Sequence, residues 1–146
     1  MALTGFWVTK NLEHYAMDSS LGGGQTIYGS GYLLKLDSNG QVASLGADFR
    51  WEKDSLYQGG EPGMTLKIGE WNQKGQSLLL SQQLVSKTFL LSGERIGQLE
   101  ADSVFVQSDS TLIHGQDTLI FVKKPSKELV EFVKRIVTFH KSKNGS

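Results

Sequence analysis

The segment GSGYLLKLDSNGQVASL, residues 29–45, contains two strand-like runs on either side of a turn. In its YLLKL run (32–36) the first, third and fifth side chains fall on one face, which is the two-residue period of a β-strand. The Asn39-Gly40 pair suits the positive φ angles of a tight hairpin turn. The segment therefore predicts a β-hairpin, with QVASLGADFRW (41–51) as the returning strand.

Short apolar runs separated by turn residues recur along most of the chain, and two glycine-rich loops, 18–25 and 57–63, are longer. The pattern predicts eight to ten strands, joined mainly by tight loops. The further runs are MTLKIGEW (64–71) with QSLLLSQQ (76–83), VSKTFLL (85–91) with RIGQLEA (95–101), and SVFVQ (103–107) with TLIH (111–114) and TLIFVKK (118–124).

The period changes after Pro125, which is expected to end the last strand. In SKELVEFVKRIVTFHK (126–141) the apolar residues recur every three or four positions, which predicts an amphipathic helix. Ser126 is a suitable N-cap, and Glu128 in the first turn has the charge that the helix dipole favours. A helix this short is marginal by itself, so its apolar stripe should pack against the strands. The stripe consists of Leu129, Phe132, Val133, Ile136, Val137 and His140.

The 146 residues suit a single domain, 1–146. The chain has no cysteine, which excludes disulfides, thiolate nucleophiles and cysteine-containing metal motifs. No apolar run reaches the roughly 20 residues of a membrane-spanning helix, so we expect no transmembrane segment. MALTGFW (1–7) has no basic segment followed by a long apolar core, so we expect no signal peptide in this chain. Both a cytoplasmic protein and a processed exported form remain open.

Many short strands with hairpin connections form either a sandwich or a closed barrel. A closed barrel leaves no exposed sheet edge, and eight strands enclose either packed side chains or one small ligand. We therefore predict an all-β fold: a single antiparallel up-and-down β-barrel of eight to ten strands over 5–124. One C-terminal amphipathic α-helix, 126–141, is expected to pack on the barrel.

The stretch LTGFWVTK (3–10) places Gly5 and Trp7 on the first strand. This Gly-x-Trp resembles the signature of the lipocalin, or calycin, family. LDSNGQV (36–42), IGEWNQKGQSLLL (68–80) and TLIFVKK (118–124) also look like compact bacterial lipocalin-like domains.

The resemblance spans about residues 5–140. It implies an up-and-down barrel in which Trp7 plugs the closed end, so Gly5 and Trp7 are structural motif residues rather than ligand contacts. Where the family places an arginine over that tryptophan, the cations available here are Lys123 and Lys124.

Net charge is zero, but residues 123–146 hold seven basic and two acidic side chains, and the preceding 122 residues hold eight and thirteen. One interpretation is a basic tail docked on an acidic body. The other is a basic patch for nucleic acid or anionic lipid. We disfavour nucleic acid because the tail has acidic residues among its lysines and lacks exposed interleaved aromatics.

The sequence contains no strong catalytic or metal-binding motif. His14, His114 and His140 fall in separate elements with no metal-ligand spacing, although His14, His114 and a carboxylate could meet in a barrel. No Gly-x-Ser-x-Gly elbow is present, and the LGGGQ loop (21–25) lacks the Gly-Lys-Ser/Thr of a phosphate loop. We therefore predict no catalytic residue, no metal and no cofactor, and we lean towards a protein that is not an enzyme.

Binding is the remaining possibility. An interior lined by aromatic and aliphatic side chains with a few hydroxyls suits a small hydrophobic or amphipathic ligand, whereas a filled barrel would hold none. The candidate ligand-binding residues are Tyr28, Tyr32, Leu34, Phe49, Trp51, Phe105 and Phe121.

Three hypotheses follow from this choice. The first is a lipocalin-like carrier of a small hydrophobic molecule. The second is a protein-interaction module of the inhibitor or immunity type with a filled barrel and a protein partner. The third is an isomerase- or cyclase-like enzyme that uses the barrel cavity.

Overall fold

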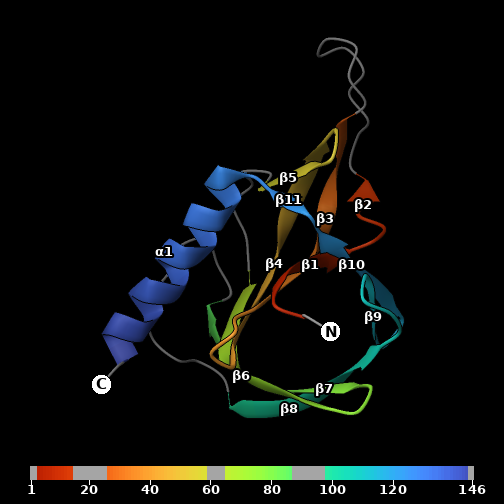
Figure 1. The fold of residues 1–146 in the computed structure, drawn as a ribbon. Helices are drawn as coiled ribbons and strands as arrows, with labels where there is room; N and C mark the ends of the chain where they lie inside the picture. Colours follow the sequence, from red (N-terminus) through yellow and green to blue (C-terminus); the bar gives the residue numbers. More distant parts are fainter. Residues whose placement is uncertain (1–2, 15–25, 59–64, 87–97, 145–146) are drawn as a thin grey trace.

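The computed structural model describes residues 3–14, 26–58, 65–86 and 98–144. Within them strands predominate, and one helix follows at the C-terminal end (Figure 1). The elements are β1 (Gly5–Thr9), β2 (Glu13–His14), β3 (Thr26–Leu36), β4 (Gln41–Glu52), β5 (Ser55–Gln58), β6 (Thr65–Lys74), β7 (Ser77–Ser86), β8 (Leu99–Val106), β9 (Thr111–His114), β10 (Asp117–Val122), β11 (Lys124–Pro125) and α1 (Lys127–Asn144).

Eight of these strands close into an antiparallel barrel in the order β1-β3-β4-β6-β7-β8-β9-β10. β10 returns to pair with β1, where Trp7 lies opposite Phe121, and β3 pairs with β4 over eleven residue pairs. Because each barrel strand pairs with the next one along the chain, the topology is up-and-down. The predicted all-β barrel with one C-terminal helix is confirmed.

The hairpin at the centre of the opening segment is confirmed, with a longer loop than a two-residue turn. Gly40 has φ +87°, and its N–H donates to the carbonyl oxygen of Asp37 at 3.1 Å. Asp37 N–H in turn donates to Gln41 O at 2.9 Å. This is a three-residue loop in which glycine alone supplies the left-handed conformation.

Two details differ from the sequence-based expectation. Tyr57 and Gln58, expected in a loop, belong to β5, which pairs with the end of β4 through a turn in which Lys53 takes φ +59°. The turn carries no glycine or proline, so neither of these turn residues marks it in the sequence. Pro125 lies within the short β11, which runs parallel to β5. The expected hairpin over 85–101 and the loop 18–25 fall largely outside the described residues.

Alternation along the strands divides the core into two clusters. The inner cluster collects side chains from strands all round the barrel, while the outer cluster lies between the opposite faces of β1, β3, β4 and β6 and the helix α1. The inner cluster is Leu3, Trp7, Leu34, Leu36, Val42, Leu78, Leu80, Val104, Val106, Leu112 and Leu119. Strands under the helix are therefore apolar on both faces.

Helix α1 lies against the outside of the barrel (Figure 1). Its N-terminus has the predicted cap, because Leu129 N–H donates to Ser126 Oγ at 3.0 Å. Leu129, Val133 and Ile136 are at most 3% exposed. The basic C-terminal segment therefore packs on the barrel through the apolar stripe of α1. The exposed side of the helix carries Lys127, Glu128, Glu131, Lys134 and Arg135. Among the described residues, no helix has the length and apolar character needed to cross a membrane.

Candidate functional site

Apolar side chains around Trp7 fill one end of the barrel interior. The indole is fully buried, its Nε1–H donates to Leu3 O at 3.0 Å, and Phe121 meets it edge to face with ring centroids 5.1 Å apart. Gly5 has φ +129°, and a Cβ there would lie 2.8 Å from the Phe121 ring. The glycine of the Gly-x-Trp pair therefore leaves room for the contact between Trp7 and Phe121. Lys124, one of the two cations available to cover Trp7, forms an ion pair with Asp54 at 3.3 Å.

The next inward positions are polar and joined by hydrogen bonds. Tyr32 Oη bonds to Ser44 Oγ at 2.8 Å, and the Ser44 hydroxyl bonds to Gln82 Oε1 at 2.5 Å. Ser44 and Gln82 are only 2% and 5% exposed. This three-residue chain crosses the interior from β3 to β7 and satisfies polar groups whose unpaired burial would cost about 1–3 kcal/mol each.

Two small features of the wall allow this chain to form. β6 lies between β4 and β7, and its Gly69 stands opposite Gln82. A Cβ on Gly69 would fall 1.8 Å from the Ser81 carbonyl oxygen, so only glycine lets β7 approach this closely. On the other side, Thr9 Oγ1 accepts the Tyr32 N–H at 2.7 Å and fixes the backbone that carries the phenol.

A second polar pair faces the phenol across the barrel. His114 Nε2 lies 2.5 Å from Asp102 Oδ2, and the imidazole ring centroid is 5.7 Å from that of Tyr32. Asp102 Oδ1 also accepts the Ser103 N–H at 2.8 Å. β10 and β1 separate the strands of His114 and Tyr32 in the sheet, so the two rings meet through the interior.

The surroundings shift two pKa values in this cluster. Burial raises the pKa of the Tyr32 phenol, against the opposing effect of the hydrogen bonds to Ser44 and Gln82, so the phenol stays protonated at neutral pH. Partial burial alone would raise the pKa of Asp102. The hydrogen bonds from His114 and Ser103 N–H outweigh it and hold the pKa below its usual value.

This end of the interior is open to solvent. Asp102 and Glu100 alternate with the inner-cluster residue Val104 and so share the inward face of β8, yet their side chains are 51% and 64% exposed. Lys67 Nζ lies 4.0 Å from Glu100 Oε2 and is 39% exposed on its side chain. The interior thus has an apolar floor around Trp7 and, at the other end, polar side chains that water can reach.

The predicted ligand-binding residues separate into two groups. Tyr32, Leu34 and Phe121 face the interior, the first among the polar groups and the other two in the apolar floor. Phe49 and Trp51 lie on the opposite face of β4 in the outer cluster, so they cannot line the interior. Phe105 also points outwards and is 47% exposed. Tyr28 pairs with Arg50 in the β3–β4 register, and its side chain is outside the described part.

Sequence reasoning missed Ser44, Gln82, Asp102 and His114 as members of one site. A signal was present, because Ser44 follows Val42 by two positions and Gln82 follows Leu80 by two, so each is a polar residue on an inward face. To group these four residues into one site, the order of the strands round the barrel must also be known. In the described part of the chain, no three His, Asp or Glu side chains form a group that could hold a metal.

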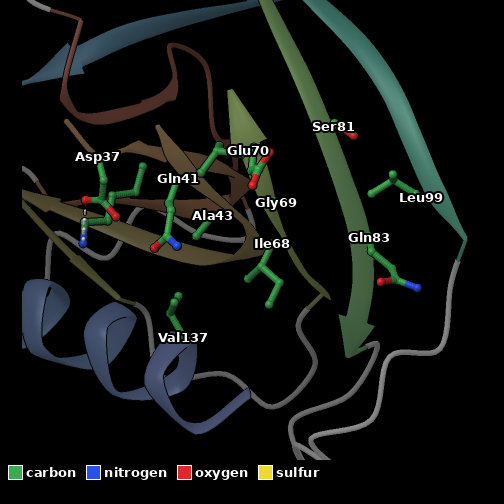
Figure 2. A pocket seen from close by; sticks show the side chains of 12 residues that line it. Asp37, Gln41, Ala43, Ile68, Gly69, Glu70, Ser81, Gln83, Leu99 and Val137 are labelled. Atoms are coloured by element: carbon green, nitrogen blue, oxygen red, sulfur yellow. Dashed lines mark ion pairs between the residues drawn. The ribbon is translucent and has the colours of Figure 1, made fainter. Parts of the chain in front are cut away.

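A separate groove of about 340 Å³ lies outside the barrel, where the far end of α1 stands over β4, β6 and β7 (Figure 2). Ala43, Ile68 and Val137 form its apolar base. Glu70 adds a carboxylate, and the Lys35–Asp37 ion pair, at 3.2 Å, lies at one side. Its lining mixes apolar, polar and charged side chains.

Comparison with known proteins gives no relative: no family model, no curated protein and no solved structure matches the chain. The function is therefore argued from the geometry of the interior.

Proposed function

We propose that the protein is a lipocalin-like barrel that binds one small amphipathic molecule in the open half of its interior. The observation that carries the proposal is the buried Tyr32–Ser44–Gln82 chain directly above an apolar floor. Pockets for small molecules combine apolar walls with a few convergent polar groups, and the barrel interior carries side chains of both kinds. Leu80 and Leu112 of the floor would meet the apolar part of the ligand.

The polar groups favour a ligand whose polar end donates hydrogen bonds, such as a hydroxyl or an amine. Tyr32 directs its proton to Ser44, which leaves a phenol oxygen lone pair for a ligand donor. Asp102, with its lowered pKa, remains an anion and accepts hydrogen bonds at neutral pH.

The contact with Asp102 also orients the His114 imidazole, as proton transfer by a side chain requires. This contact is the specific support for the isomerase-like alternative. If a ligand is recovered chemically unchanged after incubation with the protein, that result favours the carrier over the isomerase-like enzyme.

Native mass spectrometry of the purified protein, followed by extraction of released molecules, is the first test. A bound molecule of amphipathic character supports the proposal and gives its class. The uncharged fluorescent probe N-phenyl-1-naphthylamine then measures uptake directly. A bare protein mass together with no probe uptake would overturn the carrier proposal.

Site variants localise the binding. Tyr32→Phe removes one hydrogen bond of the chain and Ser44→Ala removes two, and each variant is expected to weaken probe binding by at least about 2- to 12-fold. Tyr57→Phe, which removes a hydroxyl from β5 outside the barrel, is the matched control and should leave binding unchanged. Equal effects of Tyr32→Phe and Tyr57→Phe would place the probe elsewhere.

A further inference from the structure

Three hydrogen-bonding groups from three different strands meet inside the barrel: the Asp102 carboxylate, the His114 imidazole and the Tyr32 phenol. The imidazole contacts the carboxylate through Nε2, and its ring centroid lies 5.7 Å from that of the phenol. Burial and, to a smaller degree, the Asp102 charge raise the pKa of Tyr32, so the carboxylate also acts on the phenol. The side chains of His114 and Asp102 are 24% and 51% exposed, so a solute can reach them.

Each of these groups offers a hydrogen-bond acceptor at neutral pH. Asp102 is ionised, so the hydrogen in its contact with His114 belongs to Nε2, and the neutral imidazole keeps Nδ1 as an acceptor. The Tyr32 hydroxyl donates to Ser44 Oγ and keeps an oxygen lone pair. A primary ammonium carries three N–H donors and no acceptor, whereas a hydroxyl carries one donor. The three acceptors therefore match a primary ammonium better than an alcohol.

The charged groups around the three acceptors are mainly negative. Within the described strands β6 to β10, the inward faces carry three carboxylates and one ammonium, which belong to Glu100, Asp102, Asp117 and Lys67. The one ammonium, that of Lys67, lies 4.0 Å from Glu100 Oε2. A surface with an excess of one charge attracts ions of the opposite sign. The charge of the interior therefore favours a cation and opposes a carboxylate.

Apolar side chains adjoin all three acceptors on the side of Trp7. Two positions along its own strand, each acceptor residue is followed by a buried member of the inner cluster, on the same face. These members are Leu34 on β3, Val104 on β8 and Leu112 on β9. Leu80 also stands opposite Asp102 in the β7–β8 register. A hydrocarbon group attached to the ammonium would therefore contact the apolar floor.

We propose that the polar end of the ligand is a protonated primary amine, which binds between Asp102, His114 and Tyr32. The inference rests on the proposed function and names the class of its ligand, an amphipathic amine and not a fatty acid. Hydrogen bonds to a charged group are stronger than neutral ones, although the half-exposed carboxylate is partly screened by water. We expect an amine to bind about 10-fold more tightly than a carboxylate with the same hydrocarbon chain.

Displacement of N-phenyl-1-naphthylamine from the wild-type protein at pH 7 tests the proposal with three competitors that share a decyl or similar chain. Decylamine, which is protonated at this pH, should displace the probe at about 10-fold lower concentration than decanoate. Decyltrimethylammonium has the same charge as decylamine but no N–H donor, so it should be the weaker of the two.

The proposal is wrong if decanoate competes as well as decylamine, or if the quaternary ammonium competes as well as the primary one. Either result leaves the proposed function intact, because the uncharged probe still binds. A protein that takes up no probe overturns the proposed function, and this inference with it.

Asp102→Asn keeps the shape of the side chain and removes its charge, so it should weaken decylamine binding about 10-fold relative to decanoate. Asp109→Asn, in the exposed turn between β8 and β9, is the matched control and should keep the wild-type ratio. A ratio that Asp102→Asn lowers no more than Asp109→Asn contradicts the proposal. Probe uptake by Asp102→Asn verifies that its interior is intact, and the wild-type competition decides the question if this variant does not fold.

Discussion

Trp7 is the largest side chain that the barrel encloses completely. Its ring lies in the apolar floor of the interior, and its one polar atom donates to the Leu3 carbonyl oxygen. A tryptophan can be buried in this way only where its N–H reaches a partner. The glycine two residues earlier serves the same packing, because it leaves space for Phe121.

Trp7→Ala should lower the free energy of unfolding by about 3–5 kcal/mol, as other large truncations in cores do. The residual cavity would lie in the apolar floor, where neighbouring strands cannot collapse into it. Urea denaturation followed by circular dichroism measures the change. Trp71→Ala, at a half-buried position near the end of β6, is the comparison and should cost less. An unchanged free energy of unfolding for Trp7→Ala would refute this role.

Asp102 should make stability depend on pH. Its pKa is lower in the folded protein than the usual value near 3.9, so the charged form is favoured by folding. The stabilisation is present above about pH 4 and is lost as the pH falls through the folded pKa. Asp102→Asn should therefore destabilise the protein near pH 7, and the difference from the wild type should shrink below about pH 4.

Thermal unfolding from pH 2 to pH 7 measures this dependence. Asp109→Asn, in the exposed turn between β8 and β9, removes a carboxylate without touching His114 and is the control. A difference between Asp102→Asn and the wild type that stays constant over this range would contradict the assignment.

Helix α1 is attached to the barrel by hydrogen bonds at its first turn as well as by its apolar side chains. Ser126 occupies the N-cap, and its own N–H donates to Leu56 O at 2.9 Å on β5. The cap therefore connects the helix start to the outer strands and sets where the apolar stripe meets the barrel.

Ser126→Ala should destabilise the protein by about 1 kcal/mol, because the Leu129 N–H loses its acceptor. Chemical denaturation at fixed temperature measures the loss. Thr138→Ala, exposed in the body of α1, should be neutral or slightly stabilising because alanine favours helix. A Ser126→Ala protein as stable as the wild type would show that the side-chain bond contributes nothing.

β4 shows why an aromatic strand face does not have to line the barrel interior. Alternation along β4 puts Phe49 and Trp51 on one face and Asp48 and Arg50 on the other. An aromatic face normally turns to the interior, but here the covering helix makes the outer face the drier one. The sequence of one strand does not show whether both of its faces are buried, because burial of the outer face depends on the element that packs against it.

At the scale of the whole molecule, the two core clusters share strands β1, β3 and β4. Each of these strands presents alternate residues to the inner and the outer cluster, so neither cluster can lose its packing alone. The barrel and α1 should therefore unfold as one cooperative unit.

Leu112→Ala in the inner cluster and Leu129→Ala in the outer cluster test this, since both leucines are fully buried. Each should cost about 2–5 kcal/mol and shift tryptophan fluorescence and circular dichroism transitions together. Leu99→Ala, 67% exposed, should change stability by less than about 0.5 kcal/mol. Separate transitions for the two probes would show that the helix unfolds independently.

The strand period, the glycine turns, the capped helix and hence the class of fold follow from the amino-acid sequence. These features are local, because a two-residue alternation, a positive φ and a helix cap involve only neighbouring residues. Which face of each strand is inside, and which polar residues meet, depends on how the strands close into the barrel. Ser44 and Gln82 are 38 residues apart in the chain, and closure of the sheet with β7 drawn close over Gly69 brings them within hydrogen-bonding distance.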